Sequence, residues 1–218
     1  MGYLERGKPM ILNERDIIRR LLKKGDLVVT PILYPEKQIG STSIDLRLGT
    51  EFKVGRVTRY THLEPRQKRE KIKSDVTKYT EDIHLAPMEP FVLHPNEFAL
   101  GATLEYIKLP NDLAARLEGR STWGRLGLQI HSTAGFVDPG FEGVLTFELQ
   151  NVGKVPIPLY AGIRVAQICF YSCNESAVPY TEKEGAKYAH TTMAMGSLFF
   201  DDYEYEIIRN QGKRRRLK

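Results

Sequence analysis

The chain has 218 residues, of which 41% are hydrophobic and 27% are charged, and its formal net charge is +5. These values are ordinary for a soluble globular protein. No apolar run is long enough to span a membrane and the N-terminus lacks the apolar core of a signal peptide, so we expect a cytoplasmic protein with no membrane partner. Much of the positive charge lies in residues 212–218. Because no nucleic-acid-binding motif accompanies this run, we expect no nucleic-acid partner.

The first predicted element is a short amphipathic helix. Asn13 can cap its N-terminus, and Glu14 and Asp16 place negative charge in its first turn, where it is favourable. Gly25 ends the helix. Its apolar stripe at helical spacing consists of Ile17, Ile18, Leu21 and Leu22.

Short strand-like segments follow, separated at short intervals by Gly, Pro and Asn. They span residues 26–33, 43–54, 91–95, 97–110, 143–151, 155–160 and 164–172. Many short strands with turn signals predict a mainly β fold, either a barrel, a sandwich or a jelly roll. The periodicity of residues 111–119 also fits a helix, but the surrounding strands favour another strand there.

The remaining segments are polar. Residues 55–85, called the charged segment below, are predicted to be an excursion from the β core. Residues 201–218 are predicted to be a polar and basic tail. We therefore expect a single domain over residues 1–218, with its core in residues 10–200.

A zinc site is the first chemical hypothesis that the sequence raises and then argues against. His62 and Glu64 match the H-x-E motif of zinc-dependent nucleobase deaminases, which needs a P-C-x-x-C motif to complete the metal cage. Cys169 and Cys173 are spaced C-x3-C and no proline precedes them, and the other histidines show no ligand spacing. We expect no metal site in the protein and read the cysteines as free thiols.

Residues 119–125 combine glycine, hydroxyl and arginine residues. Glycine lets a backbone approach a ligand closely, hydroxyl groups donate hydrogen bonds, and a guanidinium can bind phosphate through two hydrogen bonds. The alternative is a polar turn before an apolar strand. The residues concerned are Gly119, Arg120, Ser121, Thr122, Gly124 and Arg125.

Downstream, residues 138–140 read Asp-Pro-Gly, a turn signature, and the apolar residues around them predict a β-hairpin. In the strand after it, alternation puts Leu145, Phe147 and Leu149 on one face; the other face holds Val144, Thr146, Glu148 and Gln150. A buried glutamate without a role is costly, so Glu148 either has a chemical role or faces solvent.

The ordered motifs together resemble the dCTP deaminase branch of the dUTPase-like superfamily. They are SIDLRLG (43–49), GRSTWGRLGL (119–128), TAGFVDPGFEG (133–143), FELQN (147–151), GIRVAQICF (162–170) and PYTEKEGAKY (179–188). The resemblance runs from about Met10 to Lys187 and is weak in the charged segment. It implies a distorted β-barrel or jelly roll that forms a homotrimer with active sites between subunits. It further implies binding of dCTP, dUTP or dTTP-type nucleotides with Mg²⁺ on their phosphates, and no zinc.

Residue roles follow from matching this sequence to the family motifs. Glu148 is implied as the catalytic base for water addition to C4 of cytosine, with Ser121 and the Ala134 carbonyl positioning that water. Arg125 is implied near the reacting centre, and Asp138 near the deoxyribose and the α-phosphate. The other implied substrate-binding residues are Arg120, Thr122, Trp123, Gly124, Thr146, Phe147, Gln167, Tyr180, Lys187 and Thr191.

The sequence departs from the family pattern in its C-terminal part and at Trp123. Thr191 stands where the family often has a glutamine that helps to close the C-terminal segment over the triphosphate, a role in which His190 or Thr192 could substitute. Trp123 is bulkier than the usual leucine and could cap a subunit interface instead of touching substrate.

Gly135, after Ala134, bears on the product. Family members that stop at dUTP often carry a larger residue there, whereas a glycine would leave room for a water beside the α-phosphate. The resemblance therefore favours the bifunctional type, which converts dCTP to dUMP, ammonia and diphosphate and so supplies dUMP for thymidylate synthesis. The alternatives are a deaminase that stops at dUTP, a dUTP diphosphatase, and a non-catalytic nucleotide-binding relative.

Overall fold

A computed structural model describes residues 10–56, 62–64, 66–176 and 178–215, the last five of them by their backbone alone. The strands are β1 (Val28–Thr30), β2 (Ser43–Gly55), β3 (Thr80–His84), β4 (Pro90–Leu93), β5 (Phe98–Lys108), β6 (Leu113–Gly119), β7 (Leu128–Gln129), β8 (Phe136–Val137), β9 (Glu142–Asn151), β10 (Ile157–Tyr160) and β11 (Arg164–Ser172). The helices are α1 (Glu14–Ile18), a π-helical turn η1 (Arg19–Lys24), α2 (Pro35–Gln38), α3 (Arg69–Tyr79), α4 (Ser121–Gly124), the 3-10 turns η2 (Tyr180–Glu182) and η3 (Phe199–Asp201), and α5 (Tyr203–Arg215).

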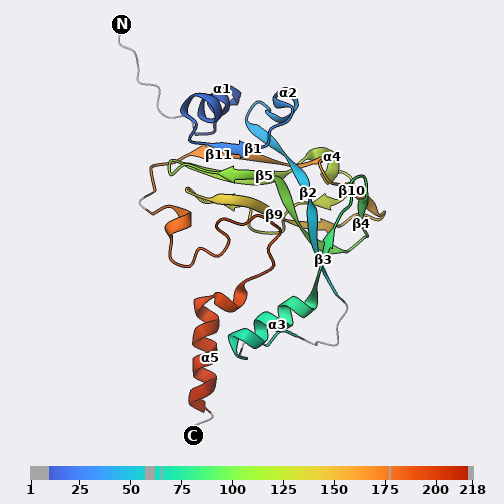
Figure 1. The fold of residues 1–218 in the computed structure, drawn as a ribbon, viewed down its shortest axis with the longest axis vertical. Helices are drawn as coiled ribbons and strands as arrows, with labels where there is room; N and C mark the ends of the chain where they lie inside the picture. The colour runs from blue at the N-terminus through green and yellow to red at the C-terminus, as the bar shows by residue number, and fades with distance from the viewer. Residues whose placement is uncertain (1–9, 57–61, 65, 177, 216–218) are drawn as a thin grey trace.

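The strands build one curled antiparallel sheet in the order β7-β9-β5-β2-β11-β6-β8, with β1 added to β5 and β3 added to β2, while β4 and β10 form a separate pair. Figure 1 shows this sheet with α1 and α2 at one end, and α3 and α5 projecting from the other. The mainly β fold predicted from the sequence is confirmed. Residues 111–119 are confirmed as a strand, since β6 alternates buried and outward residues and pairs with β11.

The N-terminal helix forms as expected, with one difference. The Asn13 side chain accepts a hydrogen bond from the Asp16 amide at 3.0 Å, and Gly25 adopts a left-handed conformation with φ of 67° at the end. Ile17 is fully buried, but Leu22 is 79% exposed. The helix continues as a π-helix from Arg19, and its wider turn changes the face on which later side chains lie. The expected stripe is therefore narrower than the sequence pattern suggested.

The charged segment and the tail contain more regular structure than expected. Within the charged segment, α3 is followed directly by β3, which pairs with β2 from Glu51 to Gly55. Ile72 and Asp75 of α3 are both buried. The predicted tail of residues 201–218 begins with the end of η3 and continues as α5. The sequence signal for α3 was weak because its apolar residues are few, although Ile72 and Val76 do have helical spacing.

A buried ion pair lies where the sheet curls. The Glu105 carboxylate, completely inaccessible, accepts hydrogen bonds from Arg47 through both the Nε (2.6 Å) and the backbone amide (2.8 Å). The Gln38 amide adds a third at 3.3 Å, and Arg47 also donates to the Pro31 carbonyl at 2.6 Å. Burial raises the pKa of the Glu105 carboxyl, and the hydrogen bonds from Arg47 oppose that effect.

Replacing Glu105 by alanine should destabilise the protein strongly. The change leaves the Arg47 guanidinium buried without its anion, a loss expected to cost about 3–5 kcal/mol. Urea denaturation at fixed protein concentration measures the effect. Asp82→Ala is the control, because Asp82 pairs with Lys53 but its side chain is 75% exposed, and it should cost less than about 1 kcal/mol. Equal costs for the two variants would contradict the importance of the buried pair.

Candidate active site

Arg120 and Trp123 are bound to two strands of the sheet, β2 and β11. Asp45 on β2 accepts from the Arg164 guanidinium at 3.0 Å and lies 3.2 Å from Nε of Arg120. The Arg120 guanidinium and the Trp123 indole both donate to the Arg164 carbonyl, at 3.1 and 2.9 Å. Burial raises the pKa of Asp45, while Arg120 and Arg164 oppose the shift. Trp123 is half-buried against the core, so its side chain already has packing partners within this chain.

The rest of this region is open to solvent. Ser121, Thr122, Gly124 and Arg125 lie on α4 and its C-cap, and all are exposed. Their hydroxyl groups and the Arg125 guanidinium are therefore available to an anionic ligand. Asp45 and Arg164 were not selected as site residues from the sequence, although both lie in quoted motifs. Pairing between Asp45 and two arginines could not be read from spacing alone.

The predicted turn is present, but the predicted hairpin is wrong. The Phe141 amide donates to the Asp138 carbonyl at 3.1 Å, and Gly140 has a φ of 76°, which favours glycine. However, β8 pairs with β6 and β9 pairs with β5 and β7. The long strand β5 offers β9 many more backbone hydrogen bonds than the two residues of β8 could. The turn therefore carries the chain from one part of the sheet to another, and leaves Asp138 exposed.

Glu148 lies half-exposed on β9, as strand alternation predicted, with Phe147 and Leu149 fully buried on the opposite face. Its carboxylate accepts a hydrogen bond from the Ser132 amide at 2.7 Å, and its own amide donates to the Ile130 carbonyl at 2.8 Å. The loop of residues 130–135, which carries Ala134 and Gly135, is therefore attached directly to the predicted base. Because Phe147 is buried, only its backbone could contact a substrate.

The space that a side chain of residue 135 would occupy is already filled by other groups. A Cβ added to Gly135 would lie 2.9 Å from the His131 ring and 3.1 Å from the Leu117 carbonyl. The Leu117 amide also donates to the Gly135 carbonyl at 2.7 Å, which fixes this approach. The expected room for a water is thus filled by His131 on that side. No motif in the sequence pointed to His131, whose Nδ1 is buried and has no hydrogen-bond partner among the described residues.

The C-terminal segment lies along β9 of the same chain. The Thr191 hydroxyl donates to the Val144 carbonyl at 3.0 Å, and the Val144 amide donates to the Thr191 carbonyl at 2.8 Å. The Met195 amide donates to the Thr146 hydroxyl at 3.2 Å, so Thr146 already has a hydrogen-bond partner within this chain. Thr191 therefore binds the strand that carries Glu148.

The other predicted C-terminal contacts are also distributed within the chain. The Tyr180 ring packs on Phe141 with centroids 5.8 Å apart. Gln167 on β11 accepts from the Ser43 hydroxyl at 3.4 Å. Lys187 forms an ion pair with Asp202. These residues do not converge on Glu148 through any contact in the described part of the chain.

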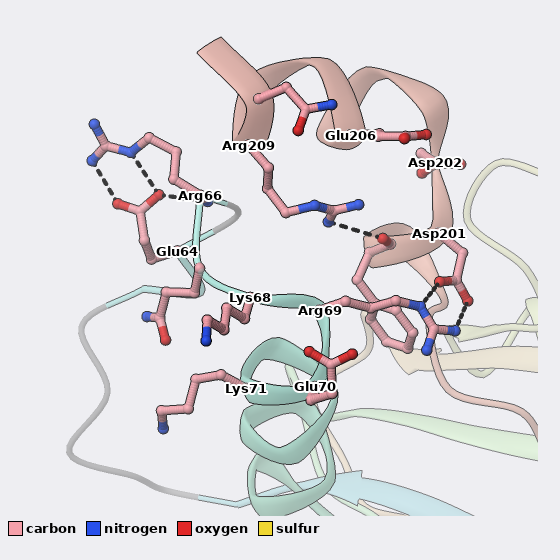
Figure 2. A pocket seen from close by; sticks show the side chains of 13 residues that line it. Glu64, Arg66, Lys68, Arg69, Glu70, Lys71, Asp201, Asp202, Glu206 and Arg209 are labelled. Atoms are coloured by element: carbon pink, nitrogen blue, oxygen red, sulfur yellow. Dashed lines mark hydrogen bonds and ion pairs between the residues drawn. The ribbon is translucent and has the colours of Figure 1, made fainter. Parts of the chain in front are cut away.

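Two cavities lie away from Glu148. One, of about 560 Å³, opens beside the turn and is lined partly by Gly140 and Glu142. The other, of about 1210 Å³, lies between α3 and α5 and is shown in Figure 2. Within the described ranges, no three His, Cys, Asp or Glu side chains lie close enough together to hold a metal ion. His62 lies exposed beside Glu64, at 3.9 Å. None of the helices in the described part of the chain is both long and apolar enough to span a bilayer.

The curled, mainly β sheet thus carries at its surface the exposed hydroxyl groups of α4 and the half-exposed Glu148 on β9. A solved structure of 2'-deoxycytidine 5'-triphosphate deaminase from Agrobacterium tumefaciens has a similar fold, with a TM-score of 0.56 and 23% identity, over 73% of this chain and 46% of that chain. The matched part is thus about half the length of that solved chain.

Sequence comparison identifies the family. Residues 11–173 match the family described as dCTP deaminase-like. A protein of Dictyoglomus thermophilum named "dCTP deaminase, dUMP-forming" is 46% identical over 180 residues, 82% of this chain and 89% of that protein. A protein of Methanothermobacter thermautotrophicus with the same name is 45% identical over 202 residues, 92% of this chain and 98% of that protein. The chain belongs to the dCTP deaminase family.

Replacing Gly135 by alanine should destabilise the loop that carries the predicted water-positioning carbonyl. The added methyl group overlaps His131 and the Leu117 carbonyl, and overpacking of this kind costs about 1–3 kcal/mol. Thermal unfolding measures the loss. Gly135→Ala combined with His131→Ala should recover part of it, because the ring no longer occupies the space.

The control is Gly196→Ala, where a Cβ would meet nothing within 4 Å. A melting temperature for Gly135→Ala equal to that of the control would show that the loop has more space than the structure indicates.

Proposed function

We propose that this protein deaminates dCTP by hydrolysis without zinc, and then releases diphosphate to give dUMP. Membership of the dCTP deaminase family supports the first reaction, and the names of the similar proteins support the second. The observation that carries the proposal is the half-exposed Glu148 carboxylate, held 2.7 Å from the Ser132 amide beside Ala134 and Gly135. Mere nucleotide binding would not require a carboxylate at this place.

In the first reaction, Glu148 takes a proton from a water molecule as that water adds to C4 of cytosine. The Ser132 amide holds Oε2 of Glu148, which leaves Oε1 to accept from the water. Ser121 and the Ala134 carbonyl orient the water. Glu148 passes this proton to N3 of the ring, and then carries the hydroxyl proton of the tetrahedral intermediate to the amino group. The C4–N bond breaks, ammonia leaves and the C4 carbonyl forms. Positioned proton transfer of this type contributes about 10²–10⁴-fold to the rate.

In the second reaction, a water attacks the α-phosphorus of dUTP. The bond between the α-phosphorus and the oxygen that bridges it to the β-phosphorus breaks, and this oxygen leaves with the diphosphate. Asp138, exposed at the turn, is the carboxylate that would accept the proton of this water. Arg125, Ser121, Thr122 and Lys187 would bind the phosphates. Mg²⁺, bound through the triphosphate, would neutralise their charge. Gly135 contributes by letting the loop pass close to Leu117, not by leaving an empty space.

The active protein is proposed to be a homotrimer with sites between subunits, acting in the cytoplasm. The donors on α4 and the Glu148 carboxylate point outward from different elements of one chain. Exposed apolar side chains lie just after α4 (Leu126, 50% exposed), just after β9 (Val152, 51% exposed) and on β8 (Phe136, 69% exposed). Such residues at a surface favour burial against another subunit. A neighbouring subunit would then bring α4 residues to the Glu148 of this one.

The product test uses the protein with dCTP and Mg²⁺, followed by anion-exchange chromatography. We expect dUMP and diphosphate, with activity lost in EDTA, restored by Mg²⁺ and unchanged by a zinc-selective chelator. dUTP as the end product would identify a deaminase that stops there. Unchanged dCTP, with dUTP consumed in a parallel reaction, would identify a dUTP diphosphatase and reject deamination. Inhibition by the zinc-selective chelator would point back to His62.

Glu148→Gln should reduce ammonia release from dCTP by at least about 10²-fold, because glutamine cannot accept the proton of water. The side chain of the glutamine keeps a carbonyl oxygen that can accept from the Ser132 amide. The affinity for the triphosphate, measured by equilibrium dialysis, should therefore be largely unchanged. Glu51→Gln serves as the control, since Glu51 lies on β2 opposite His84 and away from β9. Normal ammonia release by Glu148→Gln would show that another group is the base.

A further inference from the structure

The segment that carries Lys187 is attached to the sheet along much of its length. Besides the bonds from Thr191 and Met195 to β9, Ala194 is buried, only 1% exposed, and packs with Ala102 and Val144. Residues 187–198, called the covering segment here, therefore follow β9 closely. The residues that follow the covering segment, Phe200 and Asp201, make further contacts with the rest of the chain.

The C-terminal end of the covering segment is bound to the charged segment through Arg69. The Asp201 carboxylate accepts two hydrogen bonds from the Arg69 guanidinium (Figure 2). One comes from Nε and the other, at 2.9 Å, from Nη2. The guanidinium also lies over the Phe200 ring, 5.5 Å from its centroid, and Phe200 is only 2% exposed. Arg209 of α5 donates to the Phe200 carbonyl at 3.0 Å. Residues 200 and 201 are thus held from both α3 and α5.

The next residue connects this attachment to the predicted phosphate ligand. Asp202 forms an ion pair with Lys187, whose side chain is 20% exposed. Adjacent aspartates therefore bind cations from two different places, Arg69 on α3 and Lys187 at the start of the covering segment. The ion pair between Lys187 and Asp202 joins the two ends of the covering segment, and Arg69 joins its C-terminal end to α3.

We propose that Arg69 is a positioning residue for nucleotide binding: by binding Asp201 it fixes the covering segment and so places Lys187 where a triphosphate can take over its ammonium from Asp202. This proposal rests on the proposed function, because it assigns Lys187 to the phosphates. It gives the charged segment a role in the site without contact between Arg69 and substrate. A purely structural role for α3 is the competing explanation.

The kinetic test reverses the charge of Arg69. Arg69→Asp places like charges beside Asp201, and we expect the KM for dCTP to rise about threefold to tenfold with kcat little changed. Adding Asp201→Arg should restore most of the affinity, because the ion pair forms again with its charges exchanged. Arg66→Asp is the matched control, since Arg66 lies in the same segment but pairs with Glu64 at 2.6 Å. Its KM should match that of the unchanged protein.

Hydrogen–deuterium exchange in the absence of nucleotide tests the attachment independently of catalysis. Amides of residues 187–198 should exchange faster in Arg69→Asp and recover in the double variant. Should Arg69→Asp not yield folded protein, Asp201→Asn tests the same pair with a smaller change. If no deamination occurs in any sample, the proposed function fails, but the exchange result still decides whether Arg69 holds the segment.

Three results would overturn the proposal. In the first, exchange in residues 187–198 is unchanged by Arg69→Asp. In the second, exchange becomes faster while the KM stays that of the unchanged protein. A KM that rises in Arg69→Asp but is not restored by Asp201→Arg would also reject it, because an effect on folding alone would give that pattern.

Discussion

The curl of the sheet depends on side chains that take the place of backbone partners where the strand ladders break. The pairing of β5 with β9 shifts register between Ala102 and Tyr106, and that of β2 with β5 shifts between Leu48 and Phe52. At this place the Glu105 carboxylate binds the Arg47 amide, and the Thr103 hydroxyl accepts from the Leu145 amide at 3.0 Å. A carboxylate and a hydroxyl thus satisfy amides that an unbroken ladder would have bonded.

This irregularity determines where the candidate site residues lie. Beyond the break, β9 pairs with β5 in regular register through Glu148, so the break fixes which way the Glu148 side chain points. On β2, Asp45 lies two residues before Arg47. Its side chain points away from the buried face that holds Leu46, towards Arg120 and Arg164. The polar contacts near α4 and the carboxylate on β9 therefore lie on strands joined at one buried cluster, whose Gln38 amide also donates to the Asp45 carbonyl at 3.4 Å.

The sequence predicted the strands well because apolar alternation directly reports which side of a strand is buried. It also predicted the orientation of Glu148. It failed where the outcome depends on competition between distant segments, as in the preference of β9 for β5 over β8. It also missed α3 and α5, whose few apolar residues give little periodicity. The crowding at Gly135 depends on the folded position of His131 and Leu117, which spacing along the chain does not reveal.

The bond between Glu148 and the Ser132 amide has a consequence for how such a site can change over evolution. Glu148, the proposed base, and the loop that carries Ala134 and Gly135 form one mechanical unit, anchored at Ile130 and Ser132 on one side and at Leu117 on the other. A loop fixed at both ends cannot gain or lose a residue without moving the base. Variation is thereby confined to substitutions within a constant loop length, and deaminases with different end products could diverge without rebuilding the strand beneath.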